Sequence, residues 1–477
     1  MYLDVLLVDP AVSMKKRYSH FSIAGNKGPS WGLAFMAAVA RREGYSADLL
    51  DLNITGLEEK SFRRYLAKWR PRIVGLTAST LGVSDAAAVA SIVKQVLPDT
   101  LTILGGSHVS AVPEETLKNY SQFDLAGIGE GELTLLDLLD VSPSSDGDFS
   151  QIDGLAWRDG EEISLSSRRQ LIPDLDWLPQ PAMDLFPHLG KYYLPALFSV
   201  KMQPAVGITT TRGCPGVCTF CANNLIHGRK VRYHNLEFVF EWIGKMVHDY
   251  GIREIQLMDD TFTSSNDYVV GFCERLLNSD MNIVWNCLVS ARTLEEDTLK
   301  LMKRAGCWQM SLGIESANKE ILRRMKKGIT VEQVDRVVNL AHSIGIATKG
   351  FFIMGFPGET HETMQETMDL AMRLPIQDFS MSIFVPYPGT PARKNIERFG
   401  TLEESWDKMS SLNVNFVPHG FTREELLTIN RASYRKFYFR ISIILAYLRR
   451  MTSPASAFIM VKGLIGLVLG FLRPTKY

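Results

Sequence analysis

Residues 212–221 read RGCPGVCTFC, and this stretch decides how the second half of the chain is interpreted. It holds three of the chain's six cysteines at the spacing CxxxCxxC: Cys214, Cys218 and Cys221. A closed structural zinc site takes four ligands, usually as two pairs. Three thiolates on one tight loop instead suit a four-iron, four-sulfur cluster whose fourth iron stays open for an exogenous ligand. The spacing therefore predicts a cluster with an open coordination position.

The cysteine stretch follows the first of six strand-like runs that alternate with helical patterns between Ala205 and about Tyr387. The runs are AVGITTT, EIQLMDD, NIVWNCLVS, QMSLGIES, TKGFFIMGFPG and FSMSIFVPYPG. Six such units predict a partial (β/α)6 barrel of the TIM type, with its chemistry on loops at the C-terminal ends of the strands. Asp259 and Asp260 follow the second run. They are candidates for a proton acceptor or a substrate contact, and equally for capping the next turn.

The first 145 residues also alternate strand-like and helical patterns, which predicts an α/β, doubly wound parallel sheet of the Rossmann or flavodoxin type. Ligands of such sheets bind at the carboxyl ends of the strands. Small residues at these ends let a large flat ligand approach the backbone. The candidate cofactor contacts there are Ser79, Thr80, Gly105, Gly106, His108, Gly129 and Glu130. His108 by itself fits an ordinary loop histidine as well as a ligand.

The remaining segments differ from these two alternating regions. Residues 146–204 predict a hairpin turning at Asp159-Gly160 and a proline-rich linker, whereas 205–400 form the barrel. Residues 401–477 predict a helical, basic and apolar region, with nine Lys or Arg and no acid from Arg431 onward. Its apolar run falls short of a spanning helix, so we expect a packed or interfacial helix.

Composition narrows the partners and the compartment. The formal net charge is zero, which gives no reason to expect a nucleic-acid partner. The start, MYLDVLLVDP, reads as a β-strand and not as a signal peptide, so we expect the reducing cytosol. There, clustered cysteines bind metal or catalyse more often than they form disulfides. The basic tail adds a hypothesis of peripheral contact with the inner face of a membrane.

At this point the chain resembles the radical S-adenosylmethionine (SAM) superfamily, whose signature CxxxCxΦC has an aromatic residue before the last cysteine, here Phe220. Further motifs follow in the family's order: LMDDTF at 257–262, GIES at 313–316, FFIMGFPGET at 351–360 and PYPGTP at 386–391. The resemblance implies an iron–sulfur cluster on the three cysteines and SAM on the open iron. It also implies SAM contacts at Phe220, Gly313, Glu315, Ser316, Gly355 and Pro357.

The N-terminal region is similar to the cobalamin-binding domain of one subclass, through LGGSHVSAVPEETL followed by DLAGIGEGE. No DxHxxG motif occurs near the N-terminus, so the resemblance implies cobalamin without a histidine on cobalt. Class B radical SAM methyltransferases and the anaerobic magnesium-protoporphyrin monomethyl ester cyclase share this arrangement.

The resemblance implies methylation of an unactivated carbon on a small, lipid-like or porphyrin-like substrate, with an external donor of the flavodoxin or ferredoxin type. Cyclisation or rearrangement without methyl transfer is the alternative. A non-enzymatic electron-transfer or zinc-binding module is the third reading. It is disfavoured by the missing fourth cysteine.

Overall fold

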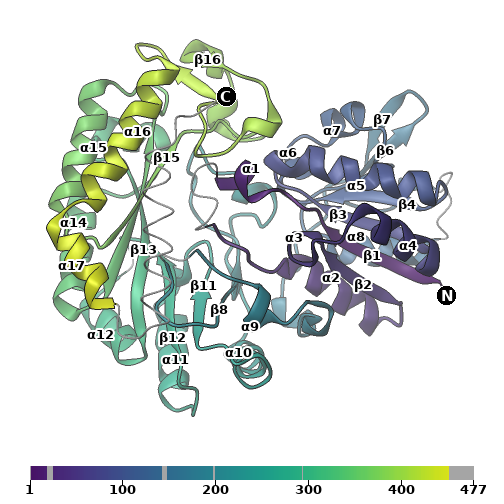
Figure 1. The fold of residues 1–477 in the computed structure, drawn as a ribbon, viewed down its shortest axis with the longest axis horizontal. Helices are drawn as coiled ribbons and strands as arrows, with labels where there is room; N and C mark the ends of the chain where they lie inside the picture. The colour runs from purple at the N-terminus through teal and green to yellow at the C-terminus, as the bar shows by residue number, and fades with distance from the viewer. Residues whose placement is uncertain (1, 19–24, 142–147, 197–198, 293, 451–477) are drawn as a thin grey trace.

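The computed structural model describes residues 2–18, 25–141, 148–196, 199–292 and 294–450, and two parallel sheets dominate it (Figure 1). The N-terminal sheet has the order β2-β1-β3-β4-β5-β6-β7. Its strands are β1 (Leu3–Asp9), β2 (Ala47–Asp51), β3 (Pro71–Thr77), β4 (Leu101–Gly105), β5 (Leu125–Gly127), β6 (Leu155–Asp159) and β7 (Glu162–Leu165). Strands β2 to β5 are parallel, and the hairpin β6–β7 adds two antiparallel strands at one edge. The expected doubly wound fold is confirmed.

Helices cover both faces of this sheet because the strands are apolar on both sides. Val5 and Leu7 of β1 face the core under α2 (Trp31–Arg42) and α8 (Glu132–Asp140). Leu6 and Val8 face the opposite core. That core lies under α4 (Glu59–Trp69) and α5 (Val83–Val96). Such two-sided burial is what parallel strands require.

The second sheet is a curled, six-stranded parallel half-barrel with the order β15-β14-β13-β12-β11-β8. Its strands are β8 (Ala205–Ile208), β11 (Glu254–Leu257), β12 (Val284–Val289), β13 (Cys307–Glu315), β14 (Ala347–Met354) and β15 (Asp378–Ile383). The main helices between them are α10 (Leu236–Tyr250), α11 (Asn266–Leu277), α12 (Glu296–Arg304), α13 (Lys319–Met325), α14 (Val331–Ile344) and α15 (His361–Arg373). All six expected strand runs form this sheet.

The described part of the C-terminal region is helical with one short hairpin. Strands β16 (Gly400–Leu402) and β17 (Phe416–Pro418) pair antiparallel, which the helical expectation missed. Helix α16 (Arg423–Tyr438) then packs along β15, where the rings of Phe437 and Phe379 stack at 4.8 Å. Helix α17 (Ile441–Arg450) follows it. The apolar run expected at 457–473 lies outside the described residues, and within them no helix is long and apolar enough to cross a membrane.

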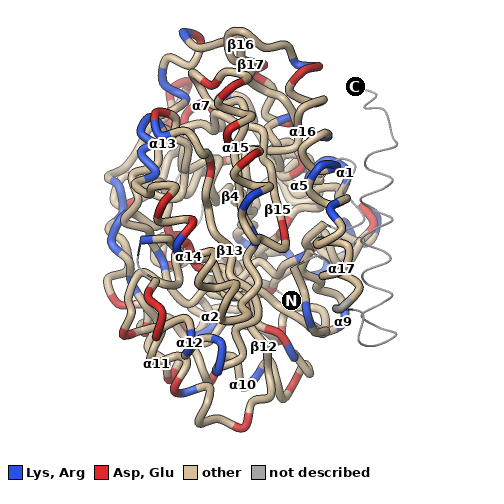
Figure 2. The backbone as a smooth tube through the Cα atoms, turned by 90° about the vertical axis from the view of Figure 1, so that its left-hand side faces the viewer, with Lys and Arg blue, Asp and Glu red and all other residues tan. Residues whose placement is uncertain are grey.

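The two halves share one apolar core. Trp31 of α2 meets Trp242 of α10 edge-on at 4.9 Å, and its indole Nε1 donates to the carbonyl of Gly207, 2.6 Å away. On another side of the N-terminal sheet, Trp406 of the C-terminal region contacts His108, and Asp407 pairs with Lys16 at 2.7 Å. The N-terminal sheet is therefore held by two separate parts of the chain. Both signs of charge are interspersed along the backbone (Figure 2).

Glu359 is a carboxyl group buried in the loop after β14, where it is only 3% exposed. Its Oε2 accepts a hydrogen bond from the backbone N–H of Phe356. Burial raises the pKa of Glu359 from its usual 4.5 to about 8. The folded protein therefore keeps this proton over a pH range in which the unfolded chain has lost it.

The free energy of unfolding should consequently fall as the pH rises from 5 to 8, because the folded state binds more protons there. Between pH 5 and 8, we expect the free energy of unfolding of Glu359→Gln to fall by about 2–4 kcal/mol less than that of the parent protein. Chemical denaturation at several pH values measures it. The control is Glu274→Gln on α11, where the side chain is exposed. Parallel pH profiles for Glu359→Gln and the parent protein would show that Glu359 is ionised in the fold.

Candidate active site

The cysteine loop begins and ends on a two-stranded ribbon. Strand β9 (Thr211–Arg212) pairs with β10 (Arg232–Tyr233), and the loop runs between them. Gly213 has φ +100°, and a Cβ there would lie 2.3 Å from the carbonyl oxygen of Lys230, so only glycine fits. The N–H of Cys214 donates to the carbonyl of Gly228 at 3.3 Å, which closes the base of the loop.

The thiols of Cys214 and Cys218 both lie close to Gly216. A Cβ on that glycine would be 3.3 Å from the first sulfur and 3.7 Å from the second. Cys221 lies near the middle of the loop and is exposed. Burial raises the pKa of the Cys218 thiol, and bound iron would reverse this by favouring the thiolate. Three cysteines on one loop, with room at Gly216, fit a cluster bound through three irons.

The end of α13 and the 3-10 turn Pro391–Arg393 hold the cysteine loop in place. The N–H of Thr219 donates to the carbonyl of Met325 at 2.9 Å, and its own carbonyl accepts from the N–H of Ala392 at 2.8 Å. Phe220 packs against an apolar cluster that includes Phe356. Phe356 lies between Gly355, which has φ +76°, and the buried Pro357. Phe220 therefore packs on the cluster that holds Phe356, whose two chain neighbours Gly355 and Pro357 the sequence singled out.

The GIES motif lies where β13 ends. Glu315 has φ +66°, an uncommon conformation for a residue with a side chain. Its Oε1 accepts from the Nζ of Lys327 at 2.6 Å. A Cβ on Gly313 would lie 2.5 Å from that carboxylate oxygen and 2.6 Å from that ammonium nitrogen, so the pair occupies the space that glycine leaves. Ser316 is fully buried, and its Oγ accepts from the N–H of Asn318.

The two aspartates differ in environment. Asp259 is fully buried, and its carboxylate accepts from the backbone N–H and the hydroxyl of both Thr210 and Thr211. Burial raises its pKa to about 6. Through these hydrogen bonds Asp259 holds Thr210 and Thr211, which lead into the cysteine loop. Asp260 lies beside that loop, where its Oδ2 accepts from the Nδ2 of Asn223 at 2.6 Å.

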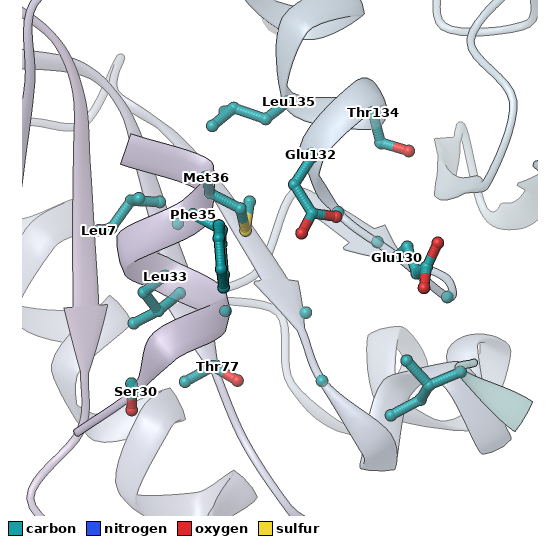
Figure 3. Close-up of a pocket in the computed structure, with 18 of the residues that line it drawn as sticks. Leu7, Ser30, Leu33, Phe35, Met36, Thr77, Glu130, Glu132, Thr134 and Leu135 are labelled. Carbon is teal, nitrogen blue, oxygen red and sulfur yellow. The ribbon is translucent and has the colours of Figure 1, made fainter. Parts of the chain in front are cut away.

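A cavity of about 350 Å³ lies between the two halves, at the carboxyl ends of the N-terminal strands (Figure 3). Its lining includes the glycines Gly75, Gly105, Gly106, Gly127, Gly129 and Gly131. At Gly106, φ is +100° and a Cβ would lie 2.6 Å from the carbonyl oxygen of Ala78. The lining is mainly backbone and apolar side chains, with Glu130 and Glu132 on one wall. A flat, largely apolar group such as part of a corrinoid fits against such a surface.

The other candidate contacts of the N-terminal sheet lie outside this cavity. Ser79 lines a neighbouring cavity of about 360 Å³. Thr80 and His108 line neither of these two cavities; their side chains approach each other, Oγ1 to Nδ1, at 3.3 Å. Burial lowers the pKa of His108 to about 4, and Trp406 covers its ring. His108 is thus a buried, neutral histidine in this structure.

Sequence reasoning missed several charged residues at the site. Lys327 lies twelve residues after Glu315, at the end of a helix whose basic residues look like an ordinary solvated surface. Arg212, Arg232 and Glu132 form buried ion pairs with partners 80 and 102 residues away in the chain. The signal available was that Arg212 and Glu132 each lie two residues from one already singled out, Cys214 and Glu130.

Comparisons with known proteins agree with this geometry. Residues 208–371 match the family model of the radical SAM superfamily, and residues 22–139 match that of the B12 binding domain. A methyltransferase of Pyrococcus horikoshii, itself uncharacterised, is 33% identical over 443 residues, covering 92% of this chain and 93% of the relative. The anaerobic magnesium-protoporphyrin IX monomethyl ester cyclase of Rubrivivax gelatinosus is 29% identical, covering 87% of this chain and 74% of the relative.

Two solved structures share the fold over nearly the whole chain. The methyltransferase TsrM from Kitasatospora setae, with cobalamin and a [4Fe-4S] cluster bound, superposes with a TM-score of 0.73 at 18% identity. That match covers 98% of this chain and 99% of TsrM. The cobalamin-dependent enzyme OxsB also gives 0.73 at 16% identity, covering 98% of this chain and 72% of OxsB. With both family models and a full-length relative in agreement, this chain belongs to the cobalamin-binding subclass of the radical SAM superfamily.

Proposed function

We propose that this protein is a cobalamin-dependent radical SAM methyltransferase acting on an unactivated carbon of a small molecule. The observation that carries the proposal is that the three-cysteine loop forms part of the wall of the glycine-lined cavity: Arg212, which precedes the loop, and Ile226 and His227 within it line the cavity. Cofactors held in these two places would act on one substrate. When bound, the cluster and SAM supply a 5′-deoxyadenosyl radical that removes hydrogen from carbon, and cobalamin supplies the methyl group.

The chain's own residues position these groups. Cys214, Cys218 and Cys221 would each hold one iron. The Glu315–Lys327 pair presents one carboxylate and one ammonium near Cys218, which suits the amino and carboxylate groups of the methionine part of SAM. Phe220 and the Gly355–Pro357 turn would line the adenine. The glycine-lined cavity would take part of the corrinoid, with Gly106 leaving the backbone accessible.

The substrate class rests on relatives alone. Among them, one is named a hopanoid C-3 methylase (Methylococcus capsulatus, 26% identical) and another a bacteriochlorophyllide d C-12(1)-methyltransferase (Chlorobaculum tepidum, 28% identical). We infer a lipid-like or porphyrin-like substrate for this chain. Oxidative cyclisation is the second candidate function, because the Rubrivivax cyclase matches most of this chain. Product analysis separates the two, since only methyl transfer forms S-adenosylhomocysteine.

The test of this function is anaerobic reconstitution with iron, sulfide and hydroxocobalamin, followed by SAM and a strong reductant. We expect 5′-deoxyadenosine, retained corrin after desalting, and S-adenosylhomocysteine. Cys214→Ala should lose cluster iron and 5′-deoxyadenosine formation, whereas Cys273→Ala, whose sulfur is buried on α11, should keep both. Deoxyadenosine without retained corrin would remove methyl transfer from the proposal. Neither signal from protein with an intact cluster would contradict it altogether.

Lys327 gives a sharper test of SAM binding. We expect Lys327→Met to raise the KM for SAM about tenfold or more, because it removes a charge-assisted contact in a largely buried site. Cluster iron should stay unchanged. The neighbouring Lys326 is exposed, so Lys326→Gln is the matched control and should leave the KM unchanged. If the KM for SAM of Lys327→Met equals that of Lys326→Gln, then Lys327 does not contact SAM and only supports Glu315. Steady-state formation of 5′-deoxyadenosine measures the KM.

The electron donor and the membrane contact belong to this proposal as its finer parts. We infer an external carrier of the flavodoxin or ferredoxin type, which the basic α13 beside the cysteine loop would suit electrostatically.

Peripheral membrane contact is motivated by the exposed apolar side chains of α17, among them Ile441 and Leu448. Co-sedimentation with phosphatidylglycerol vesicles should then be salt-dependent and lost on deletion of residues 440–477. Vesicle binding that survives the deletion would count against this region.

A further inference from the structure

Two buried arginines face each other at the base of the cysteine loop. Arg212 of β9 and Arg232 of β10 are register partners in the ribbon. They are only 9% and 5% exposed. Like charges directly opposite each other on paired strands destabilise the pairing. The ribbon that carries the loop therefore needs negative charge from elsewhere in the chain.

That charge comes from the N-terminal sheet. The Nη2 of Arg212 donates to the Oε1 of Glu132 at 2.6 Å, and its Nη1 lies 3.4 Å from the Oε1 of Glu130. Arg232 binds Glu130 with both terminal nitrogens, at 2.9 and 2.7 Å. Two positive and two negative charges thus meet in a buried network. Together these ionic contacts hold the pKa of Glu130 well below its usual range, against the opposite effect of burial.

Further contacts with Ile172 and His227 complete the network. Glu130 also accepts from the backbone N–H of Ile172, and the Nδ1 of His227 lies 3.1 Å from its Oε1. Arg232 donates further to the carbonyls of Ile172 and His227. The acceptor positions of Glu130 are therefore occupied by protein groups, which leaves it poorly suited to contact a cofactor directly.

The same residues touch both places where cofactors would bind. Arg212 directly precedes the cysteine loop, and His227 lies within it. Glu130, Glu132, Arg212 and His227 also line the glycine-lined cavity, and Figure 3 shows the two glutamates on its wall. Buried ion pairs often contribute no more stability than apolar residues of similar volume would. What they add is a fixed length and direction between two elements.

We propose that Arg212, Arg232, Glu130 and Glu132 are positioning residues that fix the cysteine loop relative to the glycine-lined cavity, and so set the separation of cluster and corrin. This rests on the proposed function. These contacts would hold the two cofactors at a fixed separation. Small displacements between reacting groups lower the rate steeply. The four residues touch neither substrate nor iron in this scheme.

The experiment uses the full chain reconstituted with iron, sulfide and hydroxocobalamin. The readout is the microwave power saturation of the cob(II)alamin electron paramagnetic resonance signal, with the cluster reduced or oxidised. A nearby reduced cluster speeds cobalt relaxation with a steep distance dependence. We expect Glu132→Gln to change this enhancement at least about twofold, because the buried Arg212 then keeps only its longer, 3.4 Å ionic contact with Glu130. Cluster and corrin content should stay within a factor of two.

Two further variants make the result decisive. Glu132→Asp keeps the charge with a shorter side chain, so it should bind both cofactors and give an intermediate enhancement, which also covers the case in which Glu132→Gln fails to fold. Asp124→Asn is the matched control, because it breaks the 2.6 Å pair with Lys94 inside the N-terminal domain. An unchanged enhancement in fully loaded Glu132→Gln or Glu132→Asp would overturn the proposal.

A second readout separates this proposal from the proposed function. Hydrogen exchange over residues 213–231, on the full chain without corrin, should be about tenfold faster in Glu132→Gln and unchanged in Asp124→Asn. If the parent protein binds no corrin, the proposed function fails, and the exchange result alone decides whether Glu132 anchors the loop. Unchanged exchange in Glu132→Gln would then show that it does not.

Discussion

Two like charges facing each other across a two-residue ribbon are the constraint on which this site depends. Arg212 and Arg232 flank the cysteine loop and are buried, and Glu130 and Glu132 from the other sheet balance them. An unpaired buried charge costs several kcal/mol. The position of the cysteine loop therefore depends on the N-terminal sheet, which supplies the two carboxylates. Cluster loop and cofactor cavity are parts of one interface.

That interface exists because both sheets are parallel and present the carboxyl ends of their strands to each other. The last residues of β3, β4 and β5 line one side of the cavity: Thr77, Gly105 and Gly127. Thr209, which follows β8, lines the other side. Parallel strands put helices on the sheet faces and leave this edge free for loops. The apolar contact of Trp31 with Trp242 joins the two halves beside the cavity.

The opposite end of the half-barrel is closed by polar contacts. Glu254, at the start of β11, accepts from the backbone N–H groups of Lys201 and Met202 at 2.6 and 2.7 Å. Its other oxygen accepts from Asn286 and Trp308, at the starts of the next two strands. Burial raises the pKa of Glu254 to about 7. These polar contacts thus close the amino ends of the strands, whereas the cysteine loop and the GIES motif lie at the carboxyl ends.

The sequence by itself determined the elements and the place of the three-cysteine loop. The alternation of strand and helix patterns is a local property, so the doubly wound sheet and the six barrel strands could be predicted. CxxxCxxC lies within eight residues, so its spacing was visible too. Only the tertiary structure decided the pairing of Arg212 with Glu132, of Glu315 with Lys327, and the burial of His108 under Trp406. The physical reason is that burial and charge balance depend on which distant segments meet, and local sequence patterns do not encode that contact.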